Sequence, residues 1–176
     1  MKRASRARAI GALLAAGVAC GPAPSVATTS IRESDCRPPA AAITAQFDEK
    51  ALGVQQCPGA AGWDVLVVSS DANSWIELRS GTTSWSAEEA IVYDMPIGLF
   101  PGVQGDAPLE WRSAGGDLRA LLFTVSALDP ADAETRLRRV FVARFADDGP
   151  ACVLGRTSAI EDARALADGD APCPAP

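Results

Sequence analysis

The sequence predicts a mainly β domain of the α+β class: an antiparallel sheet, arranged as a sandwich or partial barrel, with a short C-terminal helix and stabilising disulfides. Three observations support this prediction. Short β-branched segments alternate with turns rich in Gly, Asp and Asn. Four cysteines follow the amino-terminal segment and can form two disulfides. The length of 176 residues corresponds to about one domain.

The amino terminus has the pattern of a secretory signal peptide. Four basic residues lie among the first eight positions, and an uncharged, mostly apolar run follows from Ala9 to Ala19. This run is too short for a transmembrane helix, which needs about 20 residues. We therefore predict a signal peptide over 1–27, a flexible lead-in over 28–40 and a single β-rich domain over 41–176.

A second interpretation of the amino terminus stays open. Gly17-Val18-Ala19-Cys20 has the form of a bacterial lipobox, with Gly17 in place of the usual leucine, and Cys20 would then carry a lipid. By either route the protein is expected in the periplasm or secreted. It would contact a membrane only through a lipid anchor at Cys20.

The other cysteines predict the disulfide pattern. Cys36 and Cys57 are 21 positions apart, and so are Cys152 and Cys173. Local loops close most easily, which favours Cys36–Cys57 and Cys152–Cys173 over the two other connectivities. The chain has no CxxC motif, which argues against a redox enzyme or a zinc ribbon.

The first half of the domain is predicted to hold one short helix and a hairpin. Residues 40–52 carry apolar side chains at helical spacing. Segments 63–68 and 74–79 are strands on either side of a polar turn. Residues 84–93 mix helix and strand preferences, whereas the many Pro and Gly residues in 94–108 predict a long irregular loop.

The second half is predicted to be a hairpin, two further strands and a helix. Two glycines in the turn between 109–113 and 118–125 favour a tight hairpin. A polar connection over 127–135 leads to a strand over 137–145. The remaining predicted elements are a short strand at 152–154 and a helix over 160–167, capped by Ser158 and ended by Gly169.

The absence of histidine restricts the chemistry. It excludes Ser-His-Asp and Cys-His nucleophiles and His-ligated zinc. Dinucleotide, P-loop and GxSxG motifs are absent, and no acidic loop has the EF-hand spacing. No catalytic residue, cofactor or metal is therefore assigned, and we expect a binding or interaction module without catalytic activity. A small carboxylate-dependent glycan hydrolase is one alternative, because that reaction needs two carboxylates and no histidine.

The charge of the mature chain bears on its partners. Residues 28–176 keep twelve basic and 22 acidic side chains, a net charge of −10. Such a field repels nucleic acid and anionic lipid. The expected partner is therefore a protein or glycan of the cell envelope, and not a nucleic acid.

Four residues are candidates for binding. Trp75 and Trp85 are flanked by serines and are expected to be exposed, whereas Trp63 and Trp111 lie in apolar strands. Glu110 and Arg112 share one face of a strand, where they could orient a polar ligand or form a plain ion pair. The predicted contact surface is the Trp75–Trp85 hairpin together with the 94–108 loop.

The order of several motifs resembles an uncharacterised family of small exported proteins of Gram-negative bacteria. The matching features are CPGxxGW from Cys57 to Trp63, EWR at 110–112, and the late cysteines Cys152 and Cys173. This chain lacks an arginine shortly after Asp71 and a histidine after Cys152, both of which belong to the pattern. The resemblance implies export and a β-rich, disulfide-bonded fold.

A second resemblance is to periplasmic lysozyme inhibitors, which are small disulfide-bonded β-barrels. The net charge of −10 and the Arg79-Ser80-Gly81 turn are similar to features of that group. It implies a second alternative, an inhibitor of a cationic hydrolase.

Overall fold

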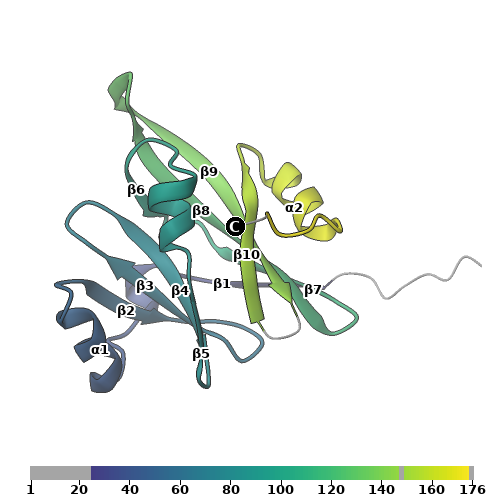
Figure 1. Cartoon of the computed structure of the whole chain (residues 1–176), viewed down its shortest axis with the longest axis horizontal. Helices are drawn as coiled ribbons and strands as arrows, with labels where there is room; N and C mark the ends of the chain where they lie inside the picture. The colour runs from purple at the N-terminus through teal and green to yellow at the C-terminus, as the bar shows by residue number, and fades with distance from the viewer. Residues whose placement is uncertain (1–24, 147–148, 175–176) are drawn as a thin grey trace, which may run out of the picture.

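The computed structural model describes residues 25–146 and 149–174. They form three layers: a four-stranded sheet, a six-stranded sheet and a helix on the outer face of the larger sheet (Figure 1). All strand pairs are antiparallel, and neither sheet closes into a barrel within these residues. The predicted fold class is confirmed. Cys20 and the rest of the predicted signal peptide up to residue 24 lie outside the described residues.

The elements fall into two sheets and four helical segments. The larger sheet contains β1 (Ser25–Thr29), β6 (Leu99–Val103), β7 (Leu109–Ala114), β8 (Asp117–Asp129), β9 (Asp132–Ala146) and β10 (Gly149–Thr157). The smaller sheet contains β2 (Gly53–Cys57), β3 (Asp64–Ser69), β4 (Ser74–Ser80) and β5 (Thr83–Ser86). The helical segments are the 3₁₀-helix η1 (Glu33–Asp35), α1 (Ala41–Asp48), the π-helix η2 (Glu89–Asp94) and α2 (Ile160–Asp168).

The strand order places β8 at the centre of the larger sheet. This order is β1-β7-β8-β9-β10, and β6 also pairs with β8. β7 pairs with β8 up to Leu122, and β6 pairs with it between Val125 and Leu128. The two strands therefore follow one another along the same side of β8. The smaller sheet has the simple order β2-β3-β4-β5.

Alternating side chains of the larger sheet supply both apolar cores. Trp111, Phe123 and Phe141 are fully buried in the core that the two sheets share. Ala120 and Leu122 belong to the second core, against α2. Because successive side chains of a strand point to opposite faces, β8 is buried on both sides. This explains its nearly continuous apolar sequence.

Both predicted hairpins are confirmed. β3 pairs with β4, and β7 pairs with β8. In the second hairpin Ala114 lies opposite Asp117, which leaves Gly115 and Gly116 as the turn, with φ values of 66° and 98°. A two-residue hairpin turn with positive φ at both positions favours glycine.

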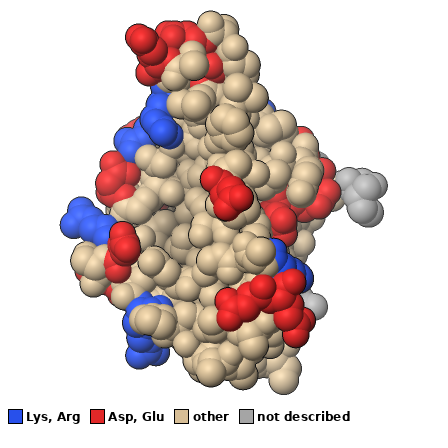
Figure 2. Space-filling model, turned by 90° about the vertical axis from the view of Figure 1, so that its left-hand side faces the viewer, with Lys and Arg blue, Asp and Glu red and all other residues tan. Residues whose placement is uncertain are grey.

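Two predicted loops are strands instead. Residues 94–108 contain β6. Residues 127–135 belong to an arm in which β8 and β9 stay paired past Ala127, the last buried core residue of β8, with Leu128 opposite Arg136. Backbone hydrogen bonds continue this ladder through mostly polar residues, so the polarity of the segment was a misleading sign of a loop. The acidic side chains at the top of Figure 2 lie where this arm ends, and Asp129, Asp132 and Glu134 belong to that end.

The segment before the first disulfide is also structured. The expected lead-in over 28–40 contains the end of β1, the buried side chain of Ile31 and η1. All five residues of β1 pair with β7. At the other end of the chain, α2 confirms the predicted helix, but its N-cap is Ala159 without a side-chain cap, so the assignment of Ser158 was wrong.

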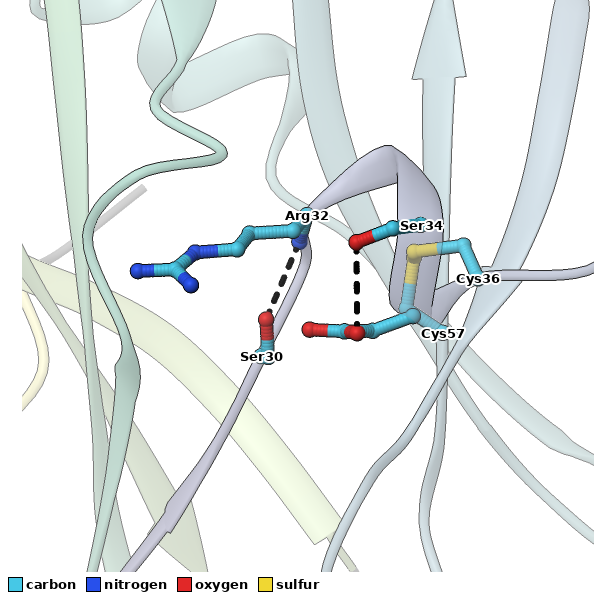
Figure 3. The surroundings of a disulfide bond; sticks show 6 residues. Ser30, Arg32, Ser34, Cys36 and Cys57 are labelled. Carbon is cyan, nitrogen blue, oxygen red and sulfur yellow. Dashed lines mark hydrogen bonds between the residues drawn. A yellow bond between two sulfur atoms is a disulfide. The ribbon is translucent and has the colours of Figure 1, made fainter.

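The predicted disulfides are both present. Cys36–Cys57 joins the residue after η1 to the end of β2, beside a hydrogen bond in which the Ser34 hydroxyl donates to Asp35 (Figure 3). Cys152–Cys173 ties the segment that follows α2 to β10. Among the described residues, none of the helices combines the length and the apolarity that a membrane crossing requires.

Candidate functional site

The EWR motif lies in the middle of β7 and uses both faces of the larger sheet. Trp111 is 1% exposed in the core between the sheets, and its indole Nε1 donates a hydrogen bond to Thr29 Oγ1 at 2.8 Å. Glu110 and Arg112 share the opposite face, as the strand period predicts, and lie under α2. The motif therefore connects β1, β7 and α2.

Glu110 and Arg112 form an ion-pair network with α2. Arg112 donates to Glu110 at 2.5 Å and to both carboxylate oxygens of Asp168 at 2.5 and 2.8 Å. Arg164 donates to both oxygens of Glu110 at 2.8 to 3.1 Å. Glu110 and Arg112 thus each have two ion-pair partners, and the network joins the helix to the sheet. Asp168 and Arg164 could not be assigned to it from the sequence, because nothing there fixes how α2 docks.

This network favours the ionised forms of Glu110 and Arg112. Burial acts to raise the pKa of Glu110, but hydrogen bonds from Arg164 and Arg112 outweigh it and hold the pKa below its usual value. The hydrogen bond to Asp168 raises the pKa of Arg112. A general acid at neutral pH needs a raised carboxyl pKa, so Glu110 is poorly suited to that role. Its hydrogen bonds with Arg164 instead join β7 to α2.

The pKa of a second carboxyl group, that of Glu77, is shifted in the opposite direction. Burial raises the pKa of Glu77 on β4, against the opposing charge of Arg79, 3.6 Å away. Arg79, at the predicted turn, also hydrogen-bonds Gln46 and lies over the ring of Phe47. Within the described residues, no three His, Cys, Asp or Glu side chains are grouped so that they could hold a metal ion.

The predicted exposure of Trp75 is wrong, because Trp75 is only 3% exposed. Trp75 shares a face of β4 with Arg79, and Arg79 lies over the ring of Phe47 of α1. This face of β4 is therefore covered and not open to solvent. Trp85 lies opposite Leu78 and hence on the other face of the sheet, where it is half-buried beside a cavity that Met95 and Cys152 also line. The structure does not bring the two tryptophans together.

The apolar side chains that do reach solvent lie farther along the chain. Tyr93, Leu99 and Phe100 are 63%, 48% and 59% exposed. Among the described residues only one other large apolar side chain, Val26, is similarly exposed. We call Tyr93, Leu99 and Phe100 the exposed apolar segment. Two of the three lie within the predicted 94–108 contact region.

A bulge in β6 directs Phe100 outward. Leu99 pairs with Leu128 and Gly102 with Ser126, so β6 has one more residue than β8 over this stretch. Phe100 has φ = 54°, and its neighbour Pro101 is buried. Left-handed backbone in a bulky residue costs about 1–3 kcal/mol and persists only where the surroundings enforce it. β-Bulges commonly redirect a side chain in this way.

Close backbone contact holds this bulge in place. A Cβ atom on Gly98 would lie 2.2 Å from the carbonyl oxygen of Leu128, so only glycine allows the two strands to approach as they do. The Val103 N–H donates to Ser74 Oγ at 3.0 Å, which fixes the other end of β6 to the smaller sheet. The bulge could not be predicted from the sequence; the many Pro and Gly residues were its only signal.

Known proteins give no further guide to this surface. No protein-family model matches the chain, and neither curated protein sequences nor solved structures show a significant match to it. What the chain binds must therefore be inferred from its own residues.

Proposed function

We propose that the chain is an exported binding module without catalytic activity, and that it recognises a protein of the cell envelope through the exposed apolar segment. One observation carries the proposal: an aromatic side chain, Phe100, is held in solvent by a strained bulge. Strain of this kind is concentrated at functional sites. Tyr93 and Leu99 add apolar surface within the same stretch of chain.

The chemistry of the segment favours a protein partner. Large aromatic anchors near the centre of an interface supply much of the binding energy between proteins. Leu99 and Phe100 have no polar group with which to bond sugar hydroxyls, so a glycan is the less suitable partner. Anchoring of β6 at Gly98 and Val103 also lowers the ordering cost on binding, because the bulge is already formed.

The cell-envelope location rests on the covalent structure. Two disulfides are typical of proteins from oxidising compartments. They agree with the expected export of the chain to the periplasm or the medium.

Site-specific photo-crosslinking tests the proposal. A photoreactive phenylalanine analogue at position 100 is expected to give one discrete adduct with an envelope protein in cells that natively produce the chain. The same analogue at the exposed Ala133, near the end of the β8–β9 arm, is the matched control. The adduct should disappear when Leu99→Asp is added. Identical adducts at both positions, or none at position 100, would contradict the proposal.

Salt dependence separates this proposal from the hydrolase-inhibitor alternative. Binding through apolar contacts should change little between low and high salt, whereas binding of a cationic hydrolase by a chain of charge −10 should weaken steeply. Steep weakening of the partner complex with salt would favour the inhibitor.

A further inference from the structure

A second cavity lies on the face of the larger sheet that carries α2, where the end of this helix meets the β7–β8 hairpin. It has a volume of about 350 Å³, which is within the range of small-ligand sites. Three arginines from three neighbouring strands line it: Arg112, Arg119 and Arg144. We call it the arginine pocket.

The strand register explains why these arginines converge. Arg112 on β7 and Arg144 on β9 both lie opposite Ala120 of β8, so the three residues form one row across the sheet. Side chains of directly paired residues point to the same face. Ala120 itself is buried in the core under α2, while Arg112 and Arg144 line the pocket together with residues 167–170 at the end of α2.

A bulge supplies the third arginine. Ala120 pairs with Arg112 and Leu118 pairs with Ser113, which leaves Arg119 as an extra residue without an opposite partner. An extra residue interrupts the strict alternation of a strand, and bulges are frequent beside active sites for this reason. Arg119 consequently lines the same pocket as its neighbours in the row.

The charges in the pocket do not cancel. Arg112 and Asp168 neutralise each other through two hydrogen bonds. Arg119 and Arg144 make no ion pair with any carboxylate of the described residues, and the single carboxylate left on the lining is Asp170. Among the described residues that line it, the pocket therefore has one positive charge in excess, which suits a singly charged anion better than a dianionic phosphate.

One donor of Arg144 lacks a hydrogen-bond acceptor among the described residues. Its Nη2 donates to the carbonyl oxygen of Gly169 at 2.6 Å, but its buried Nε–H has no partner in the described part of the chain. Buried donors are nearly always satisfied, so the unpartnered Nε–H of Arg144 is unusual. A carboxylate matches the planar fork of a guanidinium group particularly well.

From this geometry we propose that the arginine pocket binds the carboxylate group of a small acid or of a peptide C-terminus through Arg119 and Arg144. The pocket is formed by β7, β8, β9 and the end of α2, whereas the exposed apolar segment lies at η2 and β6. The proposal is therefore independent of the proposed protein contact at Phe100.

NMR titration of the disulfide-bonded protein at constant ionic strength tests this site. The probes are acetate, acetyl-Ala-Ala with a free carboxylate, the same dipeptide as its amide, and inorganic phosphate. Both carboxylates are expected to shift the Nε–Hε signals of Arg119 and Arg144 saturably, and the amide is expected to leave them unchanged. Tighter binding of the dipeptide than of acetate would identify a peptide C-terminus, and equal binding a small acid.

Arginine variants complete the test. Arg119→Gln should weaken carboxylate binding by about tenfold or more, the usual effect of losing one charge-assisted hydrogen bond. Arg119 is exposed and makes no internal side-chain hydrogen bond among the described residues, so this variant should fold normally. Arg136→Gln, with the same charge change on the arm of β9, should bind as the parent does. Arg144→Lys should also weaken binding, because it keeps the charge but loses the fork.

Three results would overturn the proposal. They are equal shifts with the amide, tighter binding of phosphate than of either carboxylate, and unchanged affinity in Arg119→Gln.

Discussion

Under the proposed function, Phe100 serves binding at the expense of stability. Its side chain gains little from burial because it is 59% exposed, and its backbone has the left-handed φ of 54°. A residue selected for stability at this position would be glycine or asparagine. The aromatic side chain is therefore better explained by a contact outside the chain.

We predict that Phe100→Gly does not destabilise the protein. Relief of the backbone strain should offset the small loss of burial, with a net change in unfolding free energy between zero and a gain of about 1 kcal/mol. The neighbouring Leu99→Gly is the control, and it should lower stability by about 0.5–1 kcal/mol because Leu99 is not among the residues with positive φ. Urea unfolding measures both. Equal losses in the two variants would show that Phe100 is not strained.

Glu110 should influence how the stability of the fold decreases at acid pH. Folding lowers its pKa from an ordinary value of 4.5, so its carboxylate stabilises the folded state above that pH, and the contribution is lost as pH falls through the lowered pKa. We expect Glu110→Gln to lower the free energy of unfolding by about 1–2 kcal/mol at pH 7. This loss is smaller than for a fully buried ion pair, because Arg164 is half exposed. The difference in unfolding free energy between the variant and the parent should become smaller below about pH 4.5.

The exposed pair of Arg138 and Asp106 is the matched control for Glu110. Asp106→Asn should change stability little at any pH, because both side chains are more than half exposed. A gap for Glu110→Gln that stays constant from pH 7 to pH 3 would contradict the assigned role of its charge.

At the scale of single residues, periodicity predicted relations within a strand but not burial. The shared face of Glu110 and Arg112, with Trp111 on the opposite face, follows from the two-residue period of β7. The error at Trp75 came from its serine neighbours, which suggested exposure, whereas tertiary packing covers that face of β4. Polar neighbours in the sequence are a weak guide to exposure.

Among the elements, β1 has consequences for how the amino terminus is processed. It pairs with β7 through all five of its residues, and Thr29 accepts the hydrogen bond of the Trp111 indole. Cleavage after Ala27 would remove Ser25, Val26 and Ala27 from this ladder. Processing at Cys20 would keep the whole strand.

We therefore predict that the mature chain begins at or before Ser25. A protein that starts at Thr28 should be less stable than one that starts at Gly21, by about 1–3 kcal/mol, because it loses strand hydrogen bonds along the EWR motif. A protein that starts at Ser25 should unfold like the longer one. The mass of the exported native protein gives the processing site directly, and an amino terminus at Thr28 would refute the prediction.

The two disulfides form a matched pair, since each closes a loop of the same sequence separation, 21 residues. Loop entropy predicts a loss of about 3 kcal/mol when either is replaced by two serines. Replacement of Cys36 and Cys57 should cost more, because Cys57 is buried in the shared core at 3% exposure, whereas Cys152 is half-buried. Urea unfolding under non-reducing conditions measures the difference. Equal losses would mean that burial of Cys57 adds nothing.

For the whole molecule, the sequence was sufficient for the fold class and insufficient for the candidate sites. Hairpins, disulfides and the last helix are local features, and their signals lie in neighbouring residues such as Gly115 and Gly116. Both candidate sites depend on bulges, at Phe100 and at Arg119, and on contacts between distant segments. A single additional residue in a ladder has no composition signature, and its position is known only once the strands are paired.

The uninterrupted length of β8 determines how the two candidate sites can be used. Arg119, near the start of this strand, lines the arginine pocket, and Leu128, near its end, pairs with the edge that carries Phe100. They are nine positions apart along an extended strand, a span of about 30 Å. The length of β8 thus sets the distance between the two candidate sites. A partner that placed its C-terminus in the pocket and an apolar surface on Phe100 at the same time would have to extend over that distance, whereas a smaller ligand would occupy one site and leave the other free.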